Sequence, residues 1–341
     1  MLSNVAFDAV GFRQSHQEKI LQKLEARRRP QDKAIVTDAV PRQPRIRMIM
    51  MAAAFATAGA VRADASPPVL PALVQPATQE HHVGKIVFAE LVTPDLETAK
   101  SFYGKLFGWT YQDIRFGRTH FAEATLNGRP VAGIVEKSLP QGANGQPFWL
   151  SFIASRDVDV AAGIALQHGA KLLFKMHDIR DLGREAVFAD PQGAIFAMLA
   201  SSSGDPSDYL ADPGSWIWSS LITNDPVASV GFYKAVFGYD SYDLPGAEDS
   251  RHFILASDNY SRASVNPLPS VRPDARPSWL NFIRVEDVTA MAAKVVALGG
   301  RNLVPPHVDR KGDEVAVVAD PSGAVFGLLE WSAAEAEGDP K

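Results

Sequence analysis

From residue 84 onward, apolar and polar positions repeat one cycle: a strand-type apolar run, an amphipathic helix, then further strand-type runs. In the first cycle "KIVFAELV" precedes Asp95, and the apolar positions between Leu96 and Phe107 fall on one helical face before Gly108. An Asp before such a face predicts an N-cap, and a glycine after it predicts a helix stop. The runs "HFAEATL" and "PVAGIV" follow. The pattern therefore predicts a helix laid on a sheet.

The cycle restarts at "FWLSFIA", with a helix expected near residues 158–167 that ends at Gly169. The strand-type runs "KLLFK", "EAVFAD" and "AIFAMLA" complete it. The turn between the last two runs contains Asp190-Pro191-Gln192-Gly193, which is the composition of a tight hairpin turn. We interpret this turn as structural.

The sequence of this stretch occurs in two similar copies. "DLETAKSFYGKLFGW" at 95–109 matches "DPVASVGFYKAVFGY" at 225–239, and "ADPQGAIF" at 189–196 matches "ADPSGAVF" at 319–326, both 130 residues apart. "WLSF" at 149–152 matches "WLNF" at 279–282 at the same spacing. Self-similarity at a fixed period indicates a duplicated structural unit.

The ordered set of a "FYxxxFGW" helix end and a "DPxGxxF" turn, occurring twice, resembles the vicinal oxygen chelate superfamily, which includes glyoxalases, bleomycin resistance proteins and extradiol dioxygenases. The resemblance covers residues 84–331. It implies an α+β fold of two tandem domains. Each domain would consist of two βαβββ modules whose strands form a curved open-barrel sheet with the helices outside.

The domain organisation follows from these patterns and from composition. We expect a disordered leader or a mis-assigned start at 1–47, a signal peptide at 48–65, a Pro-rich linker at 66–83, a first domain at 84–203, a linker at 204–213, a second domain at 214–333 and a tail at 334–341. The 204–213 linker is expected to be exposed.

The signal-peptide prediction rests on three adjacent features. Arg45 and Arg47 form a positive flank, the residues from Met48 to Val61 are apolar, and Ala63-Asp64-Ala65 is a small-x-small cleavage pattern. The apolar run is too short for a membrane span, which needs roughly 20 residues. We expect a secreted or periplasmic protein without a stable span. The alternative is an alanine-rich surface helix, and translation beginning at Met48 or Met50 would explain the long leader.

Composition excludes several classes of function. The 341-residue chain has a net charge of −5 and no Lys/Arg stripe beyond the first 50 residues, so nucleic acid is not expected as a partner. With no cysteine, it has no disulfide, thiolate nucleophile or Cys-ligated zinc.

The resemblance also implies where a metal would be held: on the first strand of each module, seven or eight residues before the helix-start Asp, and on its last strand. The residues there are Phe88, Trp149, Trp218 and Trp279 on first strands, and Ala197 and Gly327 on last strands. None offers the imidazole or carboxylate that such a cation requires, and a shift by one residue supplies only a single donor such as Glu90. We expect neither metal nor cofactor.

The rings at these positions favour a small apolar or aromatic molecule as the partner, since aromatic side chains offer stacking surfaces. The open alternative is that the tryptophans fill the barrel. Two histidine pairs recur between the copies: His120 with His252, a candidate for anion binding, and His177 with His307, a candidate for proton transfer. The candidate ligand-binding set is therefore Phe88, Glu90, His120, Trp149, His177, Trp218, His252, Trp279 and His307, with no catalytic residue assigned.

The function that these observations favour is an exported tandem protein of the glyoxalase-like type that binds an apolar or aromatic small molecule without a metal. Two enzyme alternatives remain. One is a metal-dependent lyase or dioxygenase whose ligands lie in another register, and the other is a metal-free catalyst that uses histidine. A third possibility is a structural protein whose clefts are filled.

Overall fold

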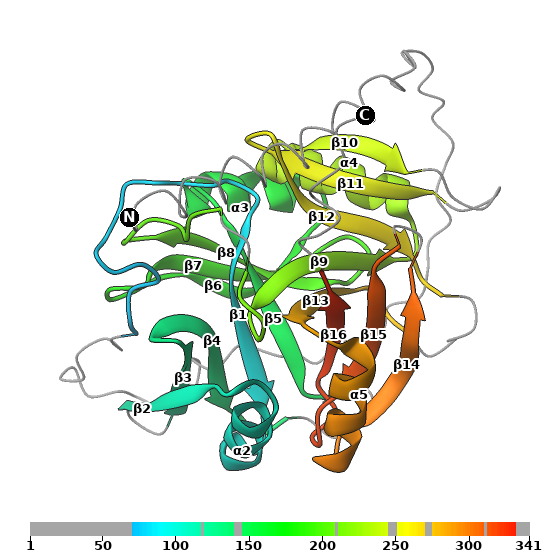
Figure 1. Cartoon of the computed structure of the whole chain (residues 1–341). Helices are drawn as coiled ribbons and strands as arrows, with labels where there is room; N and C mark the ends of the chain where they lie inside the picture. The colour runs from blue at the N-terminus through cyan, green and yellow to red at the C-terminus, as the bar shows by residue number, and fades with distance from the viewer. Residues whose placement is uncertain are drawn as a thin grey trace, which may run out of the picture.

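The computed structural model describes residues 70–116, 119–139, 145–208, 211–244, 251–269, 275–309 and 312–331. The expected leader at 1–47, the signal peptide at 48–65 and the tail at 334–341 lie outside these ranges. The described residues form two eight-stranded sheets and four helices (Figure 1).

The first sheet has the strand order β2-β3-β4-β1-β5-β8-β7-β6. Its strands and the two helices between them are β1 (Ile86–Thr93), α2 (Leu96–Phe107), β2 (Thr110–Phe116), β3 (Thr119–Leu126), β4 (Arg129–Glu136), β5 (Phe148–Ala154), α3 (Val158–Gln167), β6 (Lys171–Ile179), β7 (Gly183–Ala189) and β8 (Ile195–Ser201).

The second sheet repeats this order as β10-β11-β12-β9-β13-β16-β15-β14. Its elements are β9 (Trp216–Thr223), α4 (Pro226–Phe237), β10 (Asp240–Leu244), β11 (His252–Ser257), β12 (Tyr260–Pro267), β13 (Ser278–Val285), α5 (Val288–Ala297), β14 (Arg301–Val308), β15 (Glu314–Ala319) and β16 (Val325–Glu330).

Each sheet joins two modules through its two central strands. β1 pairs parallel with β4 and antiparallel with β5, and β5 pairs parallel with β8; β9, β12, β13 and β16 repeat the arrangement. The predicted α+β fold of tandem βαβββ modules is confirmed, with curved open sheets rather than closed barrels.

The helices begin where the sequence predicts. Asp95, Asp157, Asp225 and Asp287 each accept a hydrogen bond from the backbone N–H three residues later, which satisfies a donor that the first helical turn leaves open. Gly108 ends α2 with a left-handed φ of 79°, a conformation that favours glycine.

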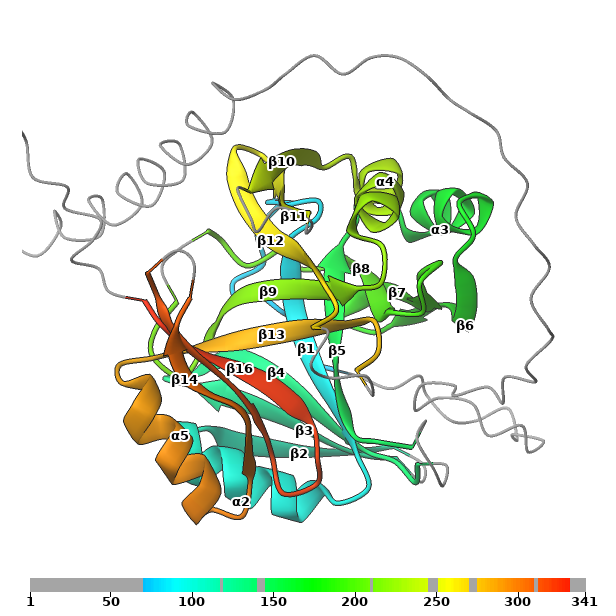
Figure 2. The same cartoon turned by 90° about the vertical axis from the view of Figure 1, so that its right-hand side faces the viewer.

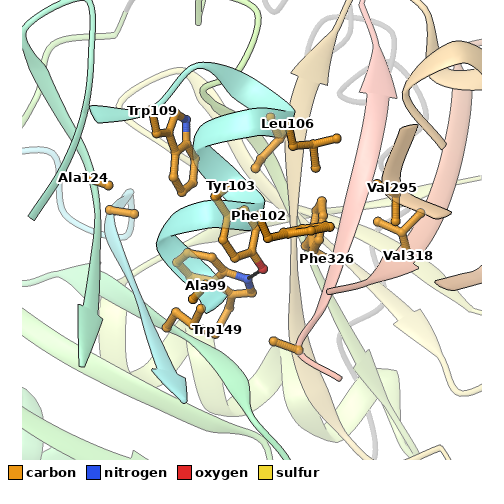
Figure 3. Close-up of a cluster of buried hydrophobic side chains, with 14 of the residues drawn as sticks. Ala99, Phe102, Tyr103, Leu106, Trp109, Ala124, Trp149, Val295, Val318 and Phe326 are labelled. Atoms are coloured by element: carbon orange, nitrogen blue, oxygen red, sulfur yellow. Dashed lines mark hydrogen bonds between the residues drawn. The ribbon is translucent and has the colours of Figure 1, made fainter. Parts of the chain in front are cut away.

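The helices of the two halves pack against one another. α2 lies beside α5, and α3 lies beside α4 (Figures 1 and 2). One buried core joins Phe102 and Leu106 of α2 to Phe326 of β16 and Val318 of β15 (Figure 3). A second core joins α3 and β8 to α4 and β11. Each half therefore completes the hydrophobic core of the other.

The duplicated "DPxG" turns tie the halves together. The Asp320 carboxylate accepts hydrogen bonds from the amides of Gly323 and Ala324 within its turn, and its other oxygen accepts one from the Tyr103 hydroxyl of α2 at 3.1 Å. Trp149 Nε1 donates to that same hydroxyl (Figure 3). Asp190, Tyr233 and Trp279 make the equivalent contacts in the other direction. These turns do more than close hairpins, because each one anchors a helix of the opposite half.

The two segments expected to be linkers are partly buried. In the 204–213 linker, Asp205 and Ala211 are buried, so the expected exposure is wrong for these positions. Asp205 exchanges hydrogen bonds with the N-terminal segment, accepting from the His82 amide and donating its own amide to the Glu80 carbonyl. Residues 70–83, part of the predicted Pro-rich linker, run along the first sheet (blue in Figure 1).

Candidate ligand-binding faces

Each sheet has one face that packs on helices and an opposite face, which we call the inner face. Because side chains alternate along a strand, residues two apart share a face. On β1, Leu91 packs in the helix-side core, so Phe88, Glu90 and Val92 point to the inner face. On β9, Leu221 packs in the helix-side core, so Trp218 and Ser220 occupy the matching inner positions.

The first inner face is closed. Its apolar residues Phe121, Val135, Leu150, Phe152 and Leu199 are buried in one cluster. Two further members of that cluster, Leu70 and Leu73, come from the N-terminal segment, with 3% and 8% of their surface exposed. This segment therefore covers the face. We define residues 70–78 as the cover.

Carboxyl groups lie beneath this closed surface. Glu90 on β1, Glu123 on β3 and Glu185 on β7 all share the inner face and are all buried. Burial raises the pKa of Glu90 to about 7, partly offset by the positive charge of Lys137. Burial and the nearby Glu90 charge raise the pKa of Glu185 to about 8. These groups hold protons at a pH where exposed carboxyls are ionised.

The second inner face carries a hydrogen-bonded row of neutral polar groups instead. His252 Nδ1 lies 2.8 Å from Asn266 Oδ1, and Asn266 Nδ2 donates to Ser264 Oγ at 3.1 Å. The Ser264 hydroxyl also accepts from Trp218 Nε1 at 3.2 Å and lies 2.7 Å from Ser220 Oγ. The row crosses three adjacent strands, β11, β12 and β9.

The direction of these hydrogen bonds fixes the histidine tautomer. Because the Asn266 amide nitrogen donates to Ser264, its oxygen faces His252 and must accept. His252 Nδ1 is therefore the donor, and in a neutral imidazole with this arrangement Nε2 is the basic nitrogen. Ser264 accepts from two donors, so its own proton is directed to Ser220.

Apolar side chains lie beside this polar row. In the strand register Trp218 is opposite Phe282, and Ser220 is opposite Leu280. Trp218, Leu280 and Phe282 are half-buried, whereas the matching residues Leu150 and Phe152 of the first sheet are almost fully buried. The second inner face thus combines accessible apolar surface with fixed hydrogen-bonding groups.

Among the predicted aromatic positions, Phe88 and Trp218 lie on inner faces, but Trp149 and Trp279 do not. Both are buried on the helix side, where their Nε1 atoms donate to Tyr103 and Tyr233. The placement of these two tryptophans on the open face is wrong by one residue, because they lie eight rather than seven positions before the N-cap. Leu150 and Leu280 take the inner positions.

The recurring histidines do not form two equivalent pairs. The strand register aligns His252 with Phe121. His120 lies one position earlier, and its Nδ1 is 2.8 Å from a carboxylate oxygen of Glu136 at the exposed surface. His177 and His307 are equivalent in register. His177 Nε2 lies 3.5 Å from Glu185, but Val315 stands opposite His307, which is exposed.

Sequence reasoning missed the partners of these residues. Ser220, Ser264, Asn266 and Phe282 on the second face, and Glu185 and the cover on the first, were not singled out. Because residues two apart on a strand share a face, Trp218 would have pointed to Ser220. The cover shows no helix or strand periodicity in its sequence from which it could be predicted.

The residues at the metal-ligand positions of the fold do not suit a metal ion. With the corrected register these positions are held by Phe88, Leu150 and Ala197 in the first sheet and by Trp218, Leu280 and Gly327 in the second. None has a side-chain atom that can act as a metal ligand. Within the described ranges, no group of three or more His, Asp or Glu side chains is arranged to hold a metal.

Comparison with known proteins agrees with this architecture. Residues 81–198 match the Glyoxalase/Bleomycin resistance protein/Dioxygenase superfamily, and residues 219–329 match the glyoxalase-like domain. The chain belongs to this superfamily. It carries the glyoxalase-like domain in two tandem copies. No helix in the described part of the chain is long and apolar enough to cross a membrane.

Relatives of this glyoxalase-like chain have diverse names. A Mycobacterium bovis protein named as a glyoxylase, CFP32, is 31% identical over 261 residues, which cover 75% of this chain and 98% of that protein. The anthracycline biosynthesis protein DnrV of Streptomyces peucetius is 29% identical, with 72% of this chain and 93% of DnrV covered.

Two solved structures share the fold. A Mn(II)-bound glyoxalase from Novosphingobium aromaticivorans superimposes with a TM-score of 0.52 at 18% identity, over 73% of this chain and 83% of that one. A homoprotocatechuate 2,3-dioxygenase from Brevibacterium fuscum gives 0.53 at 13% identity, over 79% and 84%.

Proposed function

We propose that this glyoxalase-like protein binds an apolar or aromatic small molecule on the inner face of its second sheet, without a metal. The observation that carries the proposal is the half-buried pair Trp218 and Phe282 beside the row from Ser220 to His252. Such a surface offers stacking to a flat ligand and hydrogen bonds to its polar edge. A relative named for the biosynthesis of anthracyclines, which are aromatic compounds, supports this ligand class.

The test uses the neutral fluorescent probe N-phenyl-1-naphthylamine with the Trp218→Ala variant. We expect the wild-type chain to bind one equivalent and Trp218→Ala to bind at least tenfold more weakly. Phe88→Ala is the matched control, because Phe88 occupies the same register position on the covered first face. Equal loss in both variants, or no binding by the wild type, would contradict the proposal.

The metal-free part of the proposal has its own test. The purified protein should contain well under one equivalent of zinc, nickel, iron or manganese. Adding these ions should neither raise its melting temperature nor produce glyoxalase or ring-cleavage activity. A stoichiometric ion that is lost in His252→Ala or His177→Ala would favour the metal-enzyme alternative.

A second candidate function is metal-free acid–base catalysis, favoured by the fixed tautomer of His252. The hydrogen bond to Asn266 holds the ring with Nε2 basic, as a general base requires. In a pure binding site, His252→Gln changes the probe affinity only modestly and identically at every pH. Turnover of a substrate that His252→Gln abolishes, while probe affinity stays near the wild-type value, would support catalysis by His252.

We also propose that the chain is exported, on the strength of the positive flank at Arg45 and Arg47, the apolar run to Val61 and the Ala63-Asp64-Ala65 pattern. Mass spectrometry of the mature N-terminus, with cleavage expected after Ala63 or Ala65, tests this. Intact cytoplasmic protein that begins at Met1 would contradict it.

A further inference from the structure

The N-terminal cover is attached to the first sheet by few contacts. Its backbone donates from Leu70 to the Arg180 carbonyl at 3.3 Å, from Val74 to Ser203 Oγ at 3.1 Å and from Thr78 to the Ser203 carbonyl at 2.8 Å. Within the described chain, residues 70–78 form no strand or helix. Leu70 and Leu73 are its buried side chains on the inner face, and Val74 is partly buried against the same cluster. A segment with so few buried contacts opens at a lower free energy than the strands beneath it.

The surface beneath the cover is unlike an ordinary structural core. Carboxyl groups of Glu90, Glu123 and Glu185 are enclosed with Phe121 and Phe152, and a buried carboxyl is costly unless it is paired. The positive charge of Lys137 acts on Glu90, whereas burial lowers the pKa of His177, whose Nε2 lies 3.5 Å from Glu185. Apolar walls with acidic groups at their base complement a molecule that has an apolar body and a positive head.

The equivalent face of the second sheet has no acidic group at these positions. Ser220 stands in place of Glu90, Ile254 in place of Glu123 and Val315 in place of Glu185. The acidic groups are therefore not a requirement of the fold. Within the described ranges, they belong to the inner face that residues 70–78 cover.

We propose that residues 70–78 are a displaceable cover over a second ligand site, the first inner face, and that this site takes apolar amines. In the closed state Leu70 and Leu73 occupy the place of the ligand's apolar body. Displacement of the cover lets water reach Glu90 and Glu185, which favours their ionised form, and the ammonium group of the ligand then meets two carboxylates. This site is independent of the one proposed on the second sheet.

Gly204 offers a way to open the cover without altering the buried site. Its φ is +87°, and a Cβ there would come within 2.9 Å of the Thr78 carbonyl oxygen, so Gly204→Ala pushes the cover away. Gly128→Ala is the matched control. Its φ of +75° imposes similar backbone strain, but a Cβ there meets nothing within 4 Å.

The experiment measures hydrogen exchange and probe stoichiometry in the full chain, each in the wild-type and Trp218→Ala backgrounds. We expect Gly204→Ala to speed exchange of the Val74 and Thr78 amides about tenfold and to add one N-phenyl-1-naphthylamine site per chain in both backgrounds. Decylamine should displace that added probe at least tenfold better than decanoate does, and Glu185→Gln should remove the preference.

Two outcomes would overturn the proposal. Faster exchange without an added site would mean that the uncovered face takes no ligand. Unchanged exchange, together with wild-type exchange as slow at Thr78 as at Leu199 in β8, would mean that the cover is a fixed part of the fold. If the wild type binds no probe but Gly204→Ala binds one equivalent, the second-sheet proposal fails while the cover proposal stands.

A second variant, Leu70→Ser/Leu73→Ser, repeats the test should Gly204→Ala not fold. The exposed pair Val160→Ser/Leu166→Ser is its control.

Discussion

The two inner faces come from one duplicated sequence pattern and differ at almost every chemically active position. The first places Phe121 and Val135 where the second places His252 and Asn266, and it has Glu90 where the second has Ser220. The first is closed by Leu70 and Leu73, whereas Trp218 and Phe282 of the second remain half-buried.

The helix-side faces show the opposite behaviour. The Asp–Tyr–Trp hydrogen bonds occur in both halves with nearly the same geometry, Asp320–Tyr103–Trp149 and Asp190–Tyr233–Trp279. Because each half completes the hydrophobic core of the other, the helix-side residues of the two halves are constrained to stay similar. The inner faces are not constrained by packing between the halves. Their residues are therefore the candidates for ligand binding.

The largest expected effect is a loss of unfolding free energy when the helix-side hydrogen bonds are removed, and it should be equal in the two halves. Asp320→Ala removes a buried acceptor that serves Gly323, Ala324 and Tyr103. We expect a loss of about 4 kcal/mol in the free energy of unfolding, measured in urea, and the same for Asp190→Ala. The exposed N-cap variant Asp225→Ala is the control, with a loss of about 1 kcal/mol. Unequal losses for the two buried aspartates would break the symmetry of the helix sides.

The next effect belongs to the first face alone and depends on pH. The pKa of Glu185 is about 8 in the folded state and near 4.5 when unfolded, so the folded state keeps a proton that the unfolded state releases. This stability contribution is complete below pH 4.5 and is lost as the pH rises through about 8. Glu185→Gln should therefore be more stable than wild type by about 3 kcal/mol at pH 9.

The control for this pH effect is Glu97→Gln, since Glu97 is exposed on α2. We expect its unfolding free energy to follow that of wild type at every pH. Equal curves for Glu185→Gln and wild type between pH 5 and 9 would show that the Glu185 carboxyl is solvated rather than enclosed by the cover.

The parts of this structure that sequence could predict are those with local causes. The N-cap at Asp95 and the left-handed Gly108 each depend on a few neighbouring residues, so the helices were predicted correctly. Trp149 was misplaced because strand parity was counted from the wrong residue, and one step reverses the face. The His120–His252 pairing failed for the same reason.

The cover and the polar row could not be found this way, because their contacts join distant positions. Val74 meets Ser203 129 residues away, and the proline-rich composition around Val74 suggests only a linker. Ser220 and Ser264 become neighbours only through the pairing of β9 with β12. Such side chains carry no signal until the register of the sheet is known.

A smaller effect is expected from the second face. Ser264→Ala removes the acceptor for Trp218 Nε1 and Asn266 Nδ2 in a partly buried setting. We expect a loss of about 2 kcal/mol in unfolding free energy, and about tenfold weaker binding of N-phenyl-1-naphthylamine. Ser241→Ala should change neither quantity, because Ser241 is half-buried on the edge strand β10 and its hydroxyl accepts only a long, exposed hydrogen bond from Lys234 among the bonds described. Unchanged probe binding by Ser264→Ala would separate the polar row from the ligand site.

The smallest expected effect is on the free energy of unfolding when one methyl group is added to each inner face, the closed first face and the more open second face. In Gly133→Ala the new Cβ would lie 2.8 Å from the Phe121 ring and 3.0 Å from Phe88, and the Phe121 ring is packed beneath the cover. In Gly327→Ala the Cβ would overlap the ring of Phe282, but that ring is half-buried, so we expect a rotation about its Cα–Cβ bond to relieve the overlap. We expect a loss of about 1.5 kcal/mol in unfolding free energy for Gly133→Ala and about 0.5 kcal/mol for Gly327→Ala, measured in urea. Because Phe282 is also part of the proposed ligand surface, Gly327→Ala should weaken probe binding although it barely alters stability. A larger loss of stability for Gly327→Ala than for Gly133→Ala would mean that the second face is the more tightly packed of the two.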